Sequence, residues 1–212
     1  MAPLVLSERY SKYFRGKHVL ITGASEGVGA EIAKMLAAAG ARATLVARTE
    51  SKLRAIEAAC EEARGQAADA TGGAAGGAGR VAFSAPADVT DEPALAAAVA
   101  AGVEALGPVD MLITCAGAAE CSYFHASDTA AFRFMMDLNY MGVVHAVRAV
   151  LPGMLRRKEG HLVAVASTLS LMGGRRAGRA SAAGPLRPGL CGRASAGGPL
   201  QAGAQAARGA GR

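Results

Sequence analysis

Residues 18–29, HVLITGASEGVG, decide the fold, because a short apolar run meets a cluster of glycines there. The run HVLIT contains β-branched residues and ends at a glycine, which predicts a buried strand. Residues 31–39, EIAKMLAAA, place apolar side chains at helical spacing, so a helix is expected next. A glycine cluster between a strand and a helix is typical of a dinucleotide-binding βαβ unit.

Each of the three glycines has a separate role in such a loop. Gly23 permits a sharp exit from the strand, Gly27 lets the backbone approach a phosphate, and Gly29 lets the helix pack closely. The helix N-terminus adds unpaired N–H groups and a partial positive charge, which suit a pyrophosphate. The alternative interpretation is a tight turn that only packs a helix against a strand.

The rest of the chain continues the alternation of strands and helices. Strands are predicted at 44–47, 81–85, 109–114 and 162–166, and helices at 51–63, 92–106 and 128–157, the last interrupted near 139–142. Nearly continuous apolar strands that alternate with helices predict an α/β fold with a doubly wound, Rossmann-like parallel sheet. Residues 65–79 are rich in glycine and alanine without periodicity and predict a flexible surface insertion.

The charge and composition divide the chain into two parts. Residues 173–212 contain seven arginines and no Lys, Asp or Glu, so the net charge of +6 leaves −1 for residues 1–172. We therefore predict a folded domain at 1–172 and a disordered Gly/Ala/Arg-rich tail at 173–212. The tail has no aromatic residue, and the pattern favours no nucleic-acid partner.

Cysteine spacing and hydropathy bound the environment of the protein. Four cysteines without CxxC or zinc spacing predict reduced thiols, no metal site and a cytosolic environment. Cys115, after the fourth predicted strand, is interpreted as a buried structural thiol. No stretch reaches the ~18–20 apolar residues needed to span a bilayer. The N-terminus lacks the order of a secretory signal.

Further residues after the strands are candidates for coenzyme binding. A site that prefers NAD usually has a carboxylate after the second strand, whereas this chain has Arg48 followed by Lys52. Both cations could pair with a 2′-phosphate, which favours NADPH, or they could be solvated residues at a helix start. Asp88 could accept a hydrogen bond from adenine or could begin a helix. Ala116 and Gly117 are small enough for a coenzyme to lie against the backbone.

Together, these motifs resemble the short-chain dehydrogenase/reductase superfamily over residues 16–172. The motifs that carry the resemblance each follow a predicted strand or interrupt the long helix: TGASEGVG at 22–29, ADV at 87–89, CAG at 115–117 and LNYMG at 138–142. Within the superfamily, four segments resemble the 3-ketodihydrosphingosine (3-dehydrosphinganine) reductases: VAR at 46–48 with Lys52, GPVDMLITCAG at 107–117, LNYMG at 138–142 and RAV at 148–150.

The resemblance implies NADPH-dependent reduction of the 3-keto group of 3-ketodihydrosphingosine to dihydrosphingosine, at the cytosolic face of the endoplasmic reticulum. It places Ser25 and Glu26 with the three glycines in the phosphate loop, and assigns Arg48, Lys52 and Asp88 to the adenosine end of NADPH. It assigns Asn139 to supporting a proton-relay water and Ser167 to hydrogen-bonding the substrate carbonyl. It also implies a long-chain keto-sphingoid substrate, association with a membrane surface, and a homo-oligomer. Some members of the family carry transmembrane segments, and from this sequence none is expected.

The chain departs from the family after Ser167. The family's proton donor is a tyrosine in a Tyr-x-x-x-Lys motif about a dozen residues later, and the lysine lowers the pKa of that tyrosine. No Tyr follows Tyr140 and no Lys follows Lys158, and the expected places hold residues such as Ala180 and Gly184 that cannot titrate. We expect the last strands of the family fold to be missing, the fifth strand to be an exposed edge, and reductase activity to be low or absent.

Alternatives remain at this point for the tail and for the function. The tail could come from a changed reading frame or splice, or be a true linker on a degenerate protein. The function could instead be that of another short-chain ketone or 3-oxoacyl reductase, or of a non-catalytic cofactor-binding fragment.

Overall fold

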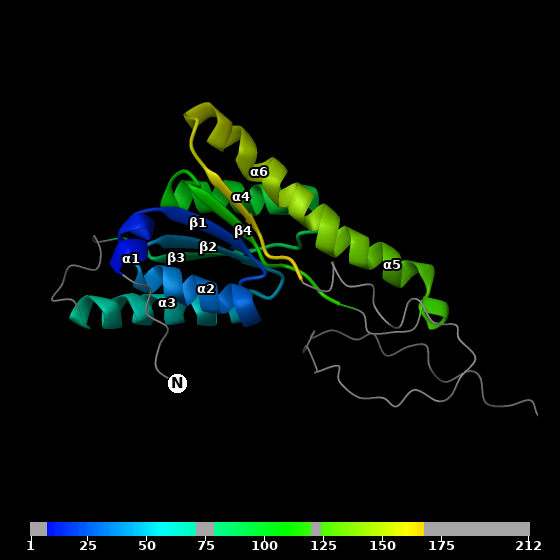
Figure 1. Cartoon of the computed structure of the whole chain (residues 1–212), viewed down its shortest axis with the longest axis horizontal. Coiled ribbons are helices and arrows are strands. Elements are labelled where there is room, and N and C mark those ends of the chain that lie inside the picture. The colour runs from blue at the N-terminus through cyan, green and yellow to red at the C-terminus, as the bar shows by residue number, and fades with distance from the viewer. Residues whose placement is uncertain (1–7, 71–78, 120–123, 168–212) are drawn as a thin grey trace, which may run out of the picture. The chain divides into compact units, whose positions relative to one another are not determined.

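The computed structural model describes residues 8–70, 79–119 and 124–167 (Figure 1). The elements follow the predicted alternation of strands and helices. In chain order they are α1 (Glu8–Phe14), β1 (His18–Thr22), α2 (Gly27–Ala38), β2 (Arg42–Ala47), α3 (Glu50–Ala70), β3 (Ala82–Pro86), α4 (Glu92–Leu106), β4 (Met111–Thr114), the 3-10 turn η1 (Phe124–Ala126), α5 (Thr129–Met136), the π-helical turn η2 (Asp137–Met141), α6 (Gly142–Arg157) and β5 (His161–Ala164).

The five described strands form one parallel sheet in the order β3-β2-β1-β4-β5. In the central strand, Leu20 is in register with Thr44 of β2 and with Leu112 of β4. The chain therefore builds outward from β1 to β3, crosses back, and continues with β4 on the other side of β1. This reversal is the switch point at which open α/β sheets bind ligands, and it confirms the predicted doubly wound fold.

Helices cover both faces of the sheet (Figure 1). On one face, Ile21 and Leu45 pack with Leu36 of α2 and Leu53 of α3. On the other face, side chains of the same strands pack with α4 and α6: Leu20, Val46, Leu112, Leu95, Val99, Ala146, Val150 and Met154. Strands buried on both faces explain why their sequences read as continuous apolar runs instead of alternating ones.

A polar network is buried at the start of the central strand. The His18 ring bonds through Nδ1 to the Gly107 carbonyl (2.7 Å) and through Nε2 to Thr44 Oγ1 (2.8 Å). Since the carbonyl only accepts, Nδ1 carries the proton and Nε2 accepts from the threonine hydroxyl. Burial lowers the pKa of His18, although the hydrogen bond to Gly107 opposes this effect. The network links β1, β2 and the end of α4 through a neutral imidazole.

The predicted insertion at 65–79 is wrong for residues 65–70, which continue α3. Arg64 anchors this part of the helix by donating from Nε to the Ala37 carbonyl (2.8 Å) and from Nη2 to the Ala41 carbonyl. Gln66 also donates to Glu62 one turn earlier (3.0 Å). Alanine has the highest helix propensity, so a glycine-containing, alanine-rich stretch can remain helical once it is anchored. Residues 71–78 and the predicted tail at 173–212 lie outside the described residues.

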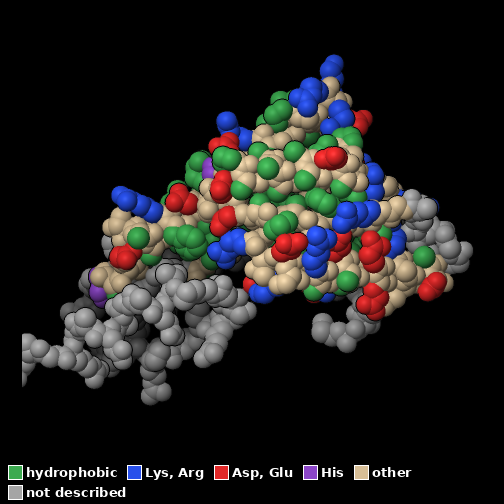
Figure 2. Space-filling model, turned by 180° about the vertical axis from the view of Figure 1, so that it is seen from behind, with side chains coloured by type: hydrophobic (Ala, Val, Ile, Leu, Met, Phe, Trp, Pro, Cys, Tyr) green, Lys and Arg blue, Asp and Glu red, His purple; other side chains and the backbone are tan. Residues whose placement is uncertain are grey.

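Two helices also differ from the sequence-based expectations. Helix α2 begins earlier than expected, at Gly27 inside the glycine loop, and α1, which was not predicted, precedes the first strand. The long helix at 128–157 is confirmed with its interruption, which is the π-helical turn η2. Figure 2 shows acidic and basic side chains interspersed on the face drawn, with basic ones at the tip where α6 ends in Arg156 and Arg157. Cations there complement the negative end of the helix dipole.

Candidate coenzyme site

The glycine loop between β1 and α2 is shaped by close backbone contacts. Gly23 has a φ of +70°, and a Cβ at this position would lie 2.6 Å from the backbone nitrogen of Ala116. A Cβ on Gly29 would overlap the carbonyl oxygen of Gly23. These two glycines are therefore needed by the fold itself, because the first turn of α2 and the loop after β4 both lie against them.

Gly27 differs from the other two loop glycines. Its φ is +61°, yet apart from its chain neighbours and its own helix backbone, no heavy atom of the described residues lies within 4 Å of the position that its Cβ would take. A left-handed glycine with open space beside it, at the first residue of a helix, leaves a place where a ligand can approach the backbone. Glu26 at the N-cap makes no side-chain hydrogen bond to the helix, so the first backbone N–H groups of α2 are not capped by it. These features fit the pyrophosphate of a dinucleotide.

Two predicted phosphate-binding residues have each other as partners. Lys52 Nζ lies 2.7 Å from Glu26 Oε2, which joins the glycine loop to the first turn of α3. Arg48, just after β2, is exposed, and its guanidinium has no hydrogen bond or ion pair within the described part of the chain. Ser25 is half-buried in the same loop. Sequence patterns pointed to Glu26 and Lys52 separately and missed their ion pair, because they lie 26 positions apart.

Asp88 follows β3 and stabilises a turn before α4. Its Oδ1 accepts hydrogen bonds from the backbone nitrogen (2.9 Å) and the hydroxyl (2.8 Å) of Thr90. Asp91 then caps α4 by accepting from the Ala94 nitrogen (3.0 Å). Asp88 thus forms a turn, the helix start considered for it belongs to Asp91, and its adenine role stays a prediction.

The loop after β4 is held by the π-helical turn. The Asn139 side chain accepts from the Ala118 nitrogen (3.0 Å) and donates to the Ala118 carbonyl (3.0 Å). A Cβ on Gly117 would lie 2.9 Å from Asn139 Oδ1, so a glycine allows this close approach. The Ala116 nitrogen faces Thr22 Oγ1 at 3.4 Å, which ties the same loop to the end of β1. Asn139 therefore braces the backbone that follows the fourth strand.

The topology places the predicted residues together at the carboxyl ends of the parallel strands. Gly23, Ala116 and Ser167 follow β1, β4 and β5, and the carboxyl ends of parallel strands meet at the same edge. Ser167 is exposed. The cradle for a dinucleotide and the predicted carbonyl-binding serine thus come from three adjacent strands.

The described thiols have the character of structural cysteines. Burial raises the pKa of Cys60 to about 12, and burial also raises the pKa of Cys115, which packs against the core. A raised pKa disfavours the thiolate that a nucleophile needs. Across residues 8–70, 79–119 and 124–167, no three His, Cys, Asp or Glu side chains gather into a group that could hold a metal ion. None of the described helices is long and apolar enough to cross a membrane.

A glycine-rich βα turn at the switch point of a sheet ordered 3-2-1-4-5 defines a dinucleotide-binding fold of the Rossmann class. The short chain dehydrogenase family matches residues 17–183, and the chain belongs to this family. Members of the family bind a nicotinamide cofactor, and the residues described above fit one.

Relatives with different names resemble the chain to similar degrees. A fatty acyl-CoA reductase of Acinetobacter baylyi is 36% identical over 76% of this chain and 50% of its own length. A 3-dehydrosphinganine reductase of Danio rerio is 35% identical over 74% of this chain and 45% of its own length. The chain thus spans about half the length of these curated relatives. Relatives at similar identity therefore carry names of different reductases.

Solved structures give the same fold with either coenzyme. An actinorhodin polyketide ketoreductase variant with NADPH has a TM-score of 0.66 and 32% identity, covering 76% of this chain and 57% of that chain. An NAD⁺-bound xylitol dehydrogenase has a TM-score of 0.67 and 27% identity, covering 77% and 57%. The choice between the two coenzymes therefore depends on this chain's own residues.

Proposed function

We propose that this chain is the NADP(H)-binding part of a short-chain reductase whose reaction is reduction of the 3-keto group of 3-ketodihydrosphingosine. The coenzyme preference rests on Arg48, an exposed guanidinium just after β2 that has no hydrogen bond or ion pair with any other described residue. An NAD site would have a carboxylate at this place for the ribose 2′-hydroxyl. A guanidinium instead suits a 2′-phosphate, which it can bind through two parallel hydrogen bonds.

Each part of the coenzyme would meet a different part of the site. The backbone at Gly27 and the start of α2 would bind the pyrophosphate, with Ser25 beside them. Arg48 and Lys52 would bind the 2′-phosphate. Asp88 would face the adenine, with Ala116 and Gly117 lining the path of the coenzyme. NADPH supplies a hydride when bound.

Two polar residues would serve the substrate side. Ser167 would donate a hydrogen bond to the substrate carbonyl and orient it. Asn139 would hold the loop after β4 and support a water that relays protons. A ketone reduction also needs a proton donor with a tuned pKa, and in this chain no Tyr follows Tyr140 and no Lys follows Lys158. We therefore propose that reductase turnover by these 212 residues is slow or absent.

The relatives support two substrate classes. The resemblance of VAR, LNYMG and RAV to ketodihydrosphingosine reductases favours a long-chain keto-sphingoid base as substrate. The reaction would then take place at the cytosolic membrane surface of the endoplasmic reticulum. The similarity to a fatty acyl-CoA reductase keeps an acyl thioester or another ketone as the second candidate. Under a third proposal, a non-catalytic fragment, the chain would bind NADPH without turnover.

The coenzyme proposal is tested by fluorescence titration of the purified chain with NADPH and NADH. We expect NADPH to bind several times more tightly, and equal or tighter binding of NADH would overturn the proposal. The substrate proposal is tested by following NADPH oxidation with ketodihydrosphingosine, a 3-oxoacyl thioester and a simple ketone, on this chain and on a full-length relative. We expect turnover of ketodihydrosphingosine by the relative and near-background rates with this chain.

A further inference from the structure

An ion pair crosses the mouth of the proposed 2′-phosphate site. Glu26 belongs to the glycine loop and Lys52 to the first turn of α3, and their charged atoms lie 2.7 Å apart. Both side chains are about half exposed, at 51% and 47%. Exposed pairs of this kind contribute little to folding stability. The pair therefore matters more for the positions in which it holds the two charges than for folding stability.

The pair also determines what the start of α2 presents to a ligand. Glu26 is the N-cap residue, and an acidic N-cap commonly accepts hydrogen bonds from the first helical N–H groups. Here its backbone is extended, with φ −163° and ψ 170°, and its side chain caps nothing. Its carboxylate turns to Lys52 instead. The ion pair thus leaves the helix donors to a pyrophosphate while it occupies one of the two cations available to a 2′-phosphate.

We propose that Glu26 competes with the coenzyme's 2′-phosphate for Lys52 and so limits how strongly the site prefers NADPH over NADH. The proposal rests on the proposed coenzyme function. A phosphate dianion that takes the Lys52 ammonium must share it with Glu26 or displace Glu26, and either outcome costs free energy because the two anions repel each other. NADH has no 2′-phosphate and leaves the pair intact. Arg48 has no acidic partner within the described ranges and binds without this competition.

The test is isothermal titration calorimetry of the purified chain with NADPH and with NADH. Glu26→Gln keeps the size of the side chain and removes its charge. We expect NADPH to bind about two- to fivefold more tightly to this variant, with NADH affinity unchanged. Glu31→Gln is the matched control, since Glu31 lies on the same helix in a similar exposed pair with Lys34 (2.6 Å). That variant should bind both coenzymes as the wild type does.

A second background separates competition from simple repulsion. Lys52→Met should weaken NADPH binding, and Glu26→Gln added to Lys52→Met should then give less than half of its gain in the wild-type background. An equal gain in both backgrounds would overturn competition for Lys52. Weaker NADPH binding by Glu26→Gln, or an equal change for NADH, would overturn it as well.

The failure of this proposal can be distinguished from failure of the proposed function. If the wild type prefers NADPH but Glu26→Gln has none of the expected effects, only the competition is overturned. If the wild type binds neither coenzyme, or prefers NADH, the coenzyme function fails and the competition fails with it. Thermal unfolding followed by circular dichroism shows whether each variant has kept the wild-type fold.

Discussion

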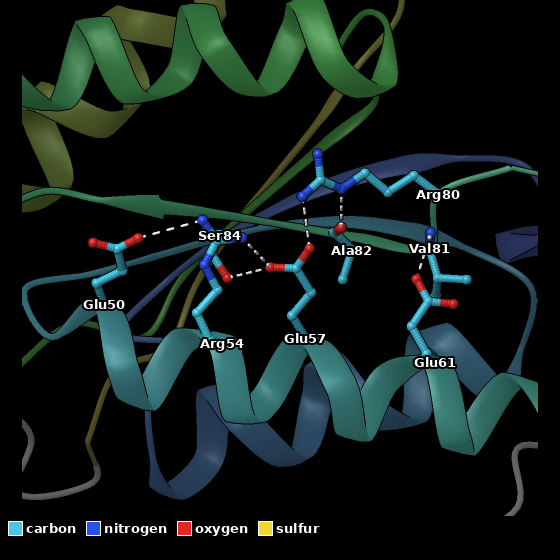
Figure 3. Close-up of polar contacts among 8 residues, drawn as sticks. All are labelled: Glu50, Arg54, Glu57, Glu61, Arg80, Val81, Ala82 and Ser84. Atoms are coloured by element: carbon cyan, nitrogen blue, oxygen red, sulfur yellow. Dashed lines mark hydrogen bonds and ion pairs between the residues drawn. The ribbon is translucent and has the colours of Figure 1, made fainter.

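The two edge strands of the described sheet are held in opposite ways. At one edge, α3 reaches over β3 with a row of polar contacts (Figure 3). At the other edge, all four residues of β5 are exposed, and Leu162, Val163 and the following Val165 are apolar. β5 pairs with β4, and its first residue, His161, meets Tyr13 Oη through Nδ1 at 2.7 Å. The β3 edge is thus closed by polar side chains from α3, whereas the β5 edge is exposed and apolar.

Glu57 is the centre of the closed edge. It accepts hydrogen bonds from Ser84 Oγ (2.6 Å) and Arg80 Nη2 (2.8 Å), and Arg54 lies at 3.3 Å (Figure 3). Burial alone would raise the pKa of Glu57, but the hydrogen bonds from Ser84 and Arg80 and the charges of Arg80 and Arg54 outweigh it and lower the pKa. Glu61 adds a bond from the Val81 nitrogen (3.2 Å).

The largest expected effect contrasts the packing at the two edges. Leu53→Ala removes a fully buried α3 side chain and should lower the free energy of unfolding by about 2–5 kcal/mol. Val163→Ala truncates a side chain that is 42% exposed and should cost about 0.5 kcal/mol or less. Urea denaturation followed by circular dichroism measures both. Equal losses in the free energy of unfolding would mean that Val163 in β5 is packed as tightly as Leu53 in α3.

The next effect breaks the polar clamp at β3. Glu57→Gln loses charge-assisted bonds to Ser84 and Arg80 and should cost about 1–2 kcal/mol at neutral pH. Because the folded-state pKa of Glu57 lies below its ordinary value of 4.5, its contribution is present above that pH and is lost as the pH falls through the folded-state pKa. Denaturation of the wild type and the variant should therefore converge in acid. A constant difference down to low pH would contradict this account.

A smaller effect on stability is expected from His18 in the central strand, β1. The folded-state pKa of His18 is lowered from 6.5, mainly by burial, so the unfolded chain takes up a proton first as the pH falls. Stability should be complete above pH 6.5 and should decline as the pH falls from 6.5 toward the folded-state pKa. His18→Gln should have a weaker dependence of the urea midpoint on pH over this range. If wild type and variant show the same dependence, His18 is not the group that titrates.

The smallest effect on stability should be found on the exposed β5 edge. Val163→Lys adds a charge to an exposed strand residue and should change the free energy of unfolding by about 0.5 kcal/mol or less. Apolar edge strands are templates for pairing between chains, and a lysine opposes such pairing. Light scattering at increasing protein concentration should show less association for this variant. Unchanged association would show that another surface is responsible.

The same contrast explains what the sequence could predict. The first strand and the glycine loop were predictable because their signals lie within twelve neighbouring residues, 18–29, whereas the helix after them was expected at 31–39 and begins at Gly27. The doubly wound parallel sheet was predictable from the alternation of apolar strands with helices, and the structure supplies its strand order, β3-β2-β1-β4-β5. Local patterns thus predict the fold class and the glycine loop.

Other features depend on contacts between distant segments and were not predictable. The Glu26–Lys52 pair and the Asn139 bonds to Ala118 join residues 26 and 21 positions apart. Arg64 anchors the extended α3 to a carbonyl in the last turn of α2 (Ala37) and to one just after it (Ala41), which no periodicity reveals. The sequence suggested that Gly27 lets a phosphate approach the backbone, but the open space beside it is a structural observation.

We expect the open position at Gly27 to seat a phosphorylated dinucleotide. Gly16 is the matched control, because it lies before β1, has a φ of +76°, and has no heavy atom of the described residues, other than its chain neighbours, within 4 Å of its Cβ position. An alanine should cost similar backbone strain at either position, about 1 kcal/mol. Isothermal titration calorimetry with NADPH should show binding to the wild type and Gly16→Ala but a loss of at least about tenfold in affinity for Gly27→Ala. Equal NADPH binding by the two variants, or no binding by the folded wild type, would contradict the account.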